Sequence, residues 1–142
     1  MNVNPPFFSV VIPLYNKAPH ISISLNSVLK QTFVDYEVIM VNDASTDGSV
    51  EVVQRFQDSR IILYHRDKPG AGGYAARNLG IKLARAEWIA FLDADDEWDV
   101  NHLKIFHDLI IKNGDLSILG SAYKSVEMVN GAGIYSESIF FK

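Results

Sequence analysis

Short apolar runs alternate with segments of helical spacing along most of this chain. Four runs predict strands, at residues 8–12, 36–41, 61–64 and 88–92. Between and after them, apolar residues recur three or four positions apart, which predicts helices with one buried stripe each. The stripes are formed by Ile21, Leu25, Val28 and Leu29, by Val50, Val53 and Phe56, by Ala76, Leu79, Leu83 and Ala84, and by Leu103, Phe106 and Ile110.

This alternation predicts βαβ units, and therefore a three-layer α/β domain with a mostly parallel sheet. We expect Pro13 to end the first strand and the run at 88–92 to be buried on both faces. A β-rich tail follows from Leu116 to Val129, and the segment Gly131–Gly133 breaks it.

The run at 88–92 ends in three carboxylates, Asp93, Asp95 and Asp96. Crowded carboxylates repel one another unless a cation or a hydrogen-bond network compensates their charge. A hard divalent cation such as Mg²⁺ or Mn²⁺ binds oxygen ligands, typically one or two carboxylates together with substrate phosphates. The alternative is a polar turn whose acids cap the following helix.

Polar residues also follow two other predicted strands, at 13–16 and at Asn42-Asp43. In parallel sheets, ligands bind at the carboxyl ends of the strands. Three such ends on one chain favour a ligand site over three unrelated turns.

The composition narrows the function classes. The chain has 142 residues, no cysteine and a net charge of −4, which excludes disulfides and thiolate zinc sites and argues against nucleic acid as a partner. No apolar run approaches the roughly 18 residues that span a bilayer, and residues 1–6 do not resemble a signal peptide. We therefore expect a cytoplasmic protein, with peripheral association at the inner face of the membrane left open.

Five motifs appear in one order and at characteristic spacing, and together they resemble the nucleotide-binding part of the family-2 glycosyltransferases, of the GT-A type, over about residues 8–100. The motifs are VVIPLYN at 10–16, SVLKQT at 27–32, EVI at 37–39 with NDASTDGS at 42–49, ARNLGI at 76–81 and DADD at 93–96. The resemblance implies a Rossmann-like GT-A fold and hexosyltransferase-like activity on a nucleotide-diphosphate sugar, most commonly a UDP-sugar. The acceptor would be a glycan or a lipid-linked sugar, as in polysaccharide biosynthesis.

The same resemblance assigns roles to individual residues. Pro13 and Tyr15 would lie against the nucleotide, Asp43 would accept a hydrogen bond from a uracil-like N–H, and Arg77 would bind the diphosphate. In the acidic cluster, which matches the family's DXD motif, Asp93 would bond the ribose hydroxyls and Asp95 would ligate Mn²⁺ or Mg²⁺. Asp96 would face the donor sugar or share the metal.

Two departures from the family pattern qualify these expectations. Many relatives have two acids where this chain has Asn42 and Asp43, so only one carboxylate remains for base recognition. The family's catalytic base would lie beyond Lys142. We therefore expect one domain over 1–142, with a nucleotide-sugar-binding core at 8–100 and a β-rich tail at 115–142 that is an incomplete acceptor half.

The tail also carries apolar residues that predict self-association into homodimers. They are Ile134, Tyr135, Ile139, Phe140 and Phe141.

The sequence bears on three other interpretations. The segment 70–75 fits the dinucleotide fingerprint G-x-G-x-x-A, but five residues separate it from the preceding strand. A phosphatase-like site at Asp93 and Asp95 lacks recognisable downstream partners. A non-catalytic nucleotide-sugar-binding or interaction domain stays open, and turnover would distinguish it from an enzyme.

Overall fold

The computed structural model describes residues 4–70, 72–114, 117–121, 123–129 and 132–138. The chain divides into two compact units, one ending at Ile105 and the other beginning at Phe106. The expectation of a single domain stays a prediction.

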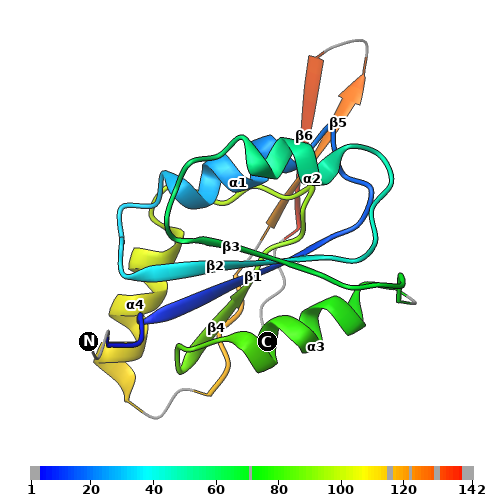
Figure 1. Cartoon of the computed structure of the whole chain (residues 1–142). Helices are drawn as coiled ribbons and strands as arrows, with labels where there is room; N and C mark the ends of the chain where they lie inside the picture. The colour runs from blue at the N-terminus through cyan, green and yellow to red at the C-terminus, as the bar shows by residue number, and fades with distance from the viewer. Residues whose placement is uncertain (1–3, 71, 115–116, 122, 130–131, 139–142) are drawn as a thin grey trace. The chain divides into compact units, whose positions relative to one another are not determined.

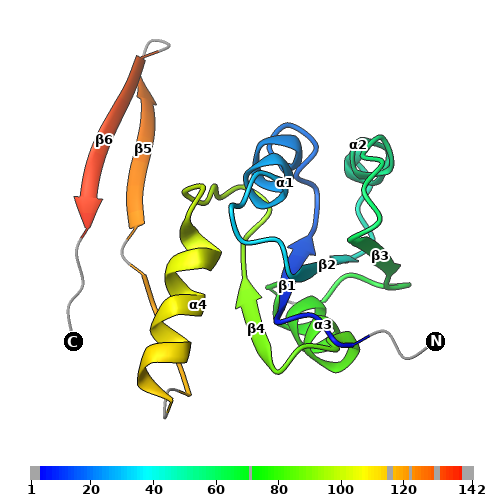
Figure 2. The same ribbon diagram turned by 90° about the vertical axis from the view of Figure 1, so that its left-hand side faces the viewer.

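The first unit is built on a parallel four-stranded sheet (Figure 1), whose strands are β1 (Phe8–Leu14), β2 (Tyr36–Asn42), β3 (Ile61–His65) and β4 (Trp88–Phe91). The strand order is β3-β2-β1-β4, and each neighbouring pair is parallel. Helices α1 (Ile21–Leu29) and α2 (Ser49–Gln54) cover one face, while α3 (Tyr74–Leu83) covers the other (Figures 1 and 2). The prediction of a three-layer α/β fold with a parallel sheet is confirmed.

Alternate residues of the central strands form two buried layers, because successive side chains of a strand point to opposite faces. Val11, Ile39 and Val41 pack with Ala76 of α3. Their neighbours Val10 and Met40 are also fully buried, and by this alternation they belong to the opposite face of the sheet, which α1 and α2 cover. Each such side chain contributes about 1.5–3 kcal/mol through burial, so this core fixes the register of β1 and β2.

Helix α3 lies against β1 at a glycine. A Cβ atom built on Gly80 would overlap the side chain of Val11. Only a residue without a side chain therefore allows α3 to lie this close to β1. Arg77 is one turn earlier on the same helix, so this contact also sets its position.

The prediction that Pro13 ends the first strand was wrong, because β1 continues to Leu14. Pairing between β1 and β4 stops at Val11 and Phe91, whereas β1 stays paired with β2 through Leu14 and Asn42. The carbonyl of Val11 points toward β4, and that of Leu14 points toward the β2 side. Because backbone groups alternate along a strand, the position of the missing N–H of Pro13 is on the β4 side, where β4 has already ended. No ladder bond is lost there.

The expectation that the run at 88–92 is buried on both faces was wrong. The strand β4 ends at Phe91, it pairs on one side with β1, and 46% of Phe91 is exposed. Its apolar run reflects a half-buried position at the edge of the described sheet.

Helix α4 (His102–Asn113) begins in the first unit and ends in the second. The second unit also contains an antiparallel hairpin of β5 (Tyr123–Val129) and β6 (Ala132–Ser138). The predicted break over Gly131–Gly133 was wrong for Ala132 and Gly133, which belong to β6. Gly131 and residues 139–142 lie outside the described residues. No helix in the described ranges is long and apolar enough to cross a membrane.

Candidate functional site

A cleft of about 520 Å³ opens at the carboxyl edge of the sheet. This volume suits a small-molecule ligand. From β1 the chain adds β2 and β3 on one side of the sheet and β4 on the other, so the order of connection switches between β1 and β4. In open α/β sheets such a switch point is where ligands bind. The residues lining the cleft are Pro13, Leu14, Tyr15, Lys17, Asp43, Gly70, Gly72, Gly73, Ala76, Arg77, Asp93, Ala94 and Asp95.

Six of the seven predicted site residues thus line one cleft, although they lie on four different segments of the chain. Tyr15 is half exposed there, which leaves its ring accessible to a flat partner. Asp96 is not among the lining residues. These positions leave the predicted roles as proposals.

Asp43 is buried and fixed from two sides. Its backbone N–H donates to the carbonyl of Leu14 at 2.8 Å. Its carboxylate accepts hydrogen bonds from the guanidinium of Arg66 and, at 2.9 Å, from the backbone N–H of Gly70. At the start of α2 the acceptor is Asp47, whose carboxylate accepts from the N–H of Ser49 at 3.0 Å, so Asp43 is not engaged in capping this helix. A carboxylate has about four acceptor positions, so Asp43 retains capacity for a ligand donor.

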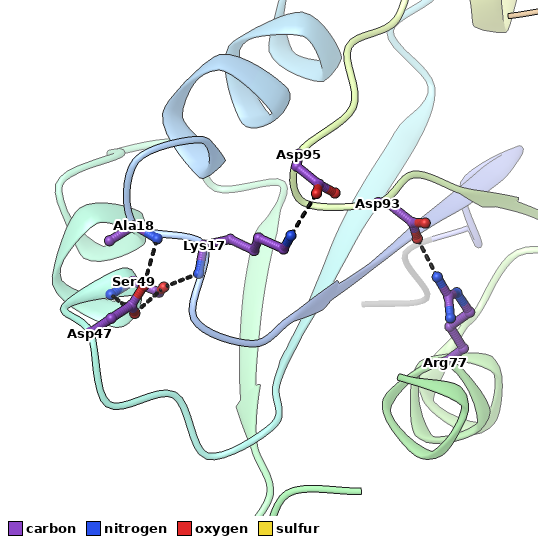
Figure 3. Close-up of polar contacts among 7 residues, drawn as sticks. All are labelled: Lys17, Ala18, Asp47, Ser49, Arg77, Asp93 and Asp95. Carbon is purple, nitrogen blue, oxygen red and sulfur yellow. Dashed lines mark hydrogen bonds and ion pairs between the residues drawn. The ribbon is translucent and has the colours of Figure 1, made fainter. Parts of the chain in front are cut away.

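Arg77 reaches back along α3 toward the cleft and pairs with Asp93 (Figure 3). Gly73 precedes the helix with a φ of +73°, in the left-handed region that favours glycine, and a Cβ atom there would lie 3.2 Å from the Arg77 guanidinium. The glycine therefore leaves room for the side chain, whose planar fork is suited to phosphate oxygens.

Asp95 pairs with Lys17 across the cleft edge, with 2.6 Å between Nζ and Oδ2 (Figure 3). The hydrogen bond from Lys17 lowers the pKa of the Asp95 carboxyl. The loop that carries Lys17 is held by the β2–α2 loop. The N–H of Lys17 donates to Ser49 Oγ at 2.8 Å, and that of Ala18 donates to Asp47 Oδ2 at 2.9 Å.

Asp96 lies beside two other charged carboxylates. Partial burial, together with the negative charges of Asp93 and Asp95, raises the pKa of its carboxyl. The three acids therefore carry more negative charge than the adjacent cations compensate, which is the condition that a divalent cation would relieve.

The cleft offers Mg²⁺ or Mn²⁺ the carboxylate of Asp95 rather than a complete set of protein ligands. Within the part of the chain that the structure describes, no three histidines or acids are grouped closely enough to hold an ion. Mg²⁺ characteristically binds through one or two carboxylates and completes its shell with waters and substrate phosphates. Asp95, on the cleft wall, is placed to supply such a carboxylate.

The loop after the acids is attached to the end of α1. Gln31 is buried, and its Nε2 donates to the carbonyl of Asp99 at 2.6 Å while its Oε1 accepts from the N–H of Leu103 at 2.9 Å. Nearby, the N–H of Trp98 donates to Ser27 Oγ at 3.1 Å. Since β4 holds the other end, the acidic loop is anchored on both sides.

Sequence reasoning did not identify Lys17, Arg66 or Gln31 as part of this arrangement. Lys17 and Arg66 each follow a strand end that faces acids of another strand, so cations at strand ends were an available signal. The sequence gave no such signal for Gln31 beyond its motif, because its partners Asp99 and Leu103 lie about 70 residues away.

Comparison with known proteins identifies one family over nearly the whole chain. The model of glycosyl transferase family 2 matches residues 9–141. The chain is 36% identical over 132 residues to the Escherichia coli protein named UDP-Glc:alpha-D-GlcNAc-diphosphoundecaprenol beta-1,3-glucosyltransferase WfgD, covering 92% of this chain and 50% of that protein.

Two solved structures are similar. S. aureus TarS 1–349 in complex with UDP-GlcNAc superimposes with a TM-score of 0.73 and 29% identity, covering 89% of this chain and 36% of that chain. The mannosyltransferase PcManGT from Pyrobaculum calidifontis, in complex with GDP-Man and Mn²⁺, gives a TM-score of 0.61 and 31% identity, covering 66% of this chain and 29% of that chain. The chain therefore spans half or less of the length of these relatives.

Proposed function

The chain belongs to glycosyl transferase family 2, and we propose that it forms the donor-binding half of an enzyme that transfers a sugar from a UDP-sugar with the help of Mn²⁺ or Mg²⁺. The observation that carries this proposal is the convergence of Asp43, Arg77, Asp93 and Asp95 on one cleft at the carboxyl edge of the sheet.

The base would lie near Tyr15 and Asp43. Asp43 is held in place by Arg66 and Gly70, so a uracil N–H would meet an acceptor whose position is fixed by the fold. Preorganised groups of this kind contribute affinity because their ordering is not required on binding. The UDP-GlcNAc complex of TarS supports uridine as the base.

The diphosphate would lie between Arg77 and the acidic loop. The guanidinium can bond two phosphate oxygens at once, and Asp93 is close enough to Arg77 to keep it oriented. A metal at Asp95 would neutralise the charge that develops on the departing nucleotide as the glycosidic bond breaks. The Mn²⁺ complex of PcManGT supports this use of a metal.

Calorimetric titration with UDP, CDP, GDP and ADP, each with and without Mn²⁺, tests the proposal. We expect UDP to bind best of the four, and more tightly with Mn²⁺ than without it. Asp95→Ala should remove the dependence of UDP affinity on metal. Asp43→Ala should lower the affinity for UDP at least tenfold and reduce the ratio of UDP affinity to CDP affinity.

Asp35→Ala is the matched control, because Asp35 is an exposed carboxylate at the amino end of β2, away from the cleft residues. It should bind as the wild type does. Equal wild-type affinity for all four nucleotides, with or without Mn²⁺, would refute the proposal.

A further inference from the structure

Each of three carboxylates at the cleft has its own cation. The pairs are Asp43 with Arg66, Asp93 with Arg77 and Asp95 with Lys17. Figure 3 shows the last two, with Arg77 extending from α3 and Lys17 from the loop between β1 and α1, toward neighbouring acids. The group proposed to ligate the metal therefore already holds a cation.

We propose that Lys17 couples metal binding to nucleotide binding by exchanging partners: its ammonium holds Asp95 while the cleft is empty, and moves to the diphosphate when the metal takes Asp95. This inference rests on the proposed function and assigns a role to a residue outside the predicted site.

The local structure lets the side chain move while the backbone stays fixed. Hydrogen bonds from Lys17 and Ala18 to Ser49 and Asp47 tie this loop to the next one. The Lys17 side chain itself is 38% exposed, and its Nζ pairs with Asp95 Oδ2. A lysine is a point charge on a flexible stem, so its ammonium can change partners without a backbone rearrangement.

The charges explain why both ligands would be needed together. A metal arriving alone must displace the ammonium from Asp95, which leaves two cations side by side. A diphosphate arriving alone must attract the ammonium away, which leaves Asp95 unpaired next to phosphate. When both arrive, each freed charge finds a new partner, and the two binding events favour each other. Such coupling is typically about 5–150-fold.

Arg77 is the poorer candidate for this coupling. Its guanidinium has five N–H donors in a rigid fork, so it can keep Asp93 and still contact a phosphate. The ammonium of Lys17 is paired with Asp95, the carboxylate proposed to ligate the metal.

The test measures Mn²⁺ binding by electron paramagnetic resonance of the free ion, and UDP binding by calorimetry, each with and without the other ligand. Lys17→Met should bind Mn²⁺ alone at least about fivefold more tightly than the wild type, and the coupling between Mn²⁺ and UDP should fall by a similar factor. Lys17→Arg keeps the charge and should retain most of the coupling. Lys82→Met, at an exposed position on α3, should match the wild type.

An Mn²⁺ affinity of Lys17→Met that is unchanged or weaker, with full coupling to UDP, would overturn the exchange and leave the proposed function standing. Failure of the wild type to bind either ligand would overturn both. If Lys17 had only a structural role, Lys17→Met would lower the affinity for both ligands. The exchange instead predicts a higher affinity for Mn²⁺ alone together with a smaller coupling, so the two roles give different results.

Discussion

Glu37 on β2 accepts a hydrogen bond from Ser9 Oγ on β1 at 2.6 Å, at the point where the two residues are paired in the parallel register. The same carboxylate accepts from the backbone N–H of Arg85 at 2.9 Å and from its Nε at 2.7 Å. Burial opposes the charge of Glu37, but these hydrogen bonds outweigh it and hold the pKa of Glu37 below its usual 4.5.

The stability of the fold should therefore depend on Glu37 in acid. Because the folded-state pKa is the lower one, the stabilisation is complete above about pH 4.5 and is lost as the pH falls below it. Glu37→Gln should make the free energy of unfolding less dependent on pH between about 5 and 3. At pH 7 it should cost about 1–3 kcal/mol, since an amide NH₂ then faces a buried donor. Urea unfolding at a series of pH values measures both effects.

Glu87→Gln is the control for this experiment, because Glu87 is exposed. Its effect should stay within about 0.5 kcal/mol. A Glu37→Gln variant with the wild-type acid profile would show that this carboxylate does not contribute to the acid sensitivity.

Gln31→Leu should destabilise the fold and weaken ligand binding together. The change leaves the N–H of Leu103 and the carbonyl of Asp99 without the hydrogen bonds from Gln31, at a cost of about 1–3 kcal/mol. It also frees the loop that follows Asp93–Asp96. We expect UDP–Mn²⁺ affinity, measured by calorimetry well below the midpoint of unfolding, to fall severalfold. Thr32→Val removes an exposed hydrogen bond to Asn101 in the same region and should leave the affinity unchanged.

Gly80→Ala should act through the spacing of α3. The added methyl group overlaps Val11, and overpacking of a core costs about 1–3 kcal/mol. Val11→Ala makes room for the methyl group, so the double variant should lose less stability than the sum of the two single losses, which is a favourable interaction energy in a double-mutant cycle measured by denaturant unfolding. Strict additivity of the two changes would contradict this contact.

Residues 1–142 alone should bind the donor but transfer sugar slowly or not at all. The chain covers 50% of the WfgD relative and 36% of TarS 1–349, and a general base typically contributes about 10²–10⁴-fold in rate. Release of UDP from a UDP-sugar, assayed with candidate acceptors, measures this. Transfer at a rate typical of full-length relatives would contradict the prediction.

The order of the elements could be predicted because each short apolar run and each helical stripe follows from residues that are neighbours in sequence. Pro13 and Phe91 show the limit of such local patterns. Whether Pro13 could stay within a strand, and how far Phe91 is exposed, both depend on where β4 stops pairing with β1. That pairing joins residues about 80 positions apart. The acids were predictable candidates because three of them follow one strand.

The partners of those acids were not predictable in the same way. Lys17 and Asp95 lie 78 residues apart in sequence, and Gln31 and Leu103 are separated by 72. Only folding brings them together, and a lone lysine or glutamine after an element has many ordinary explanations.

The three ion pairs at the cleft also bear on how fast a ligand arrives. Paired charges largely cancel at a distance, and the chain as a whole carries a net charge of −4. An anionic nucleotide therefore experiences no long-range attraction toward the cleft, in contrast to sites that steer their ligands electrostatically. Its encounter rate should stay near that of unguided diffusion and should not decrease when added salt screens the surface charges. Selectivity at this cleft thus arises after collision, in how long a nucleotide remains rather than in how often it arrives.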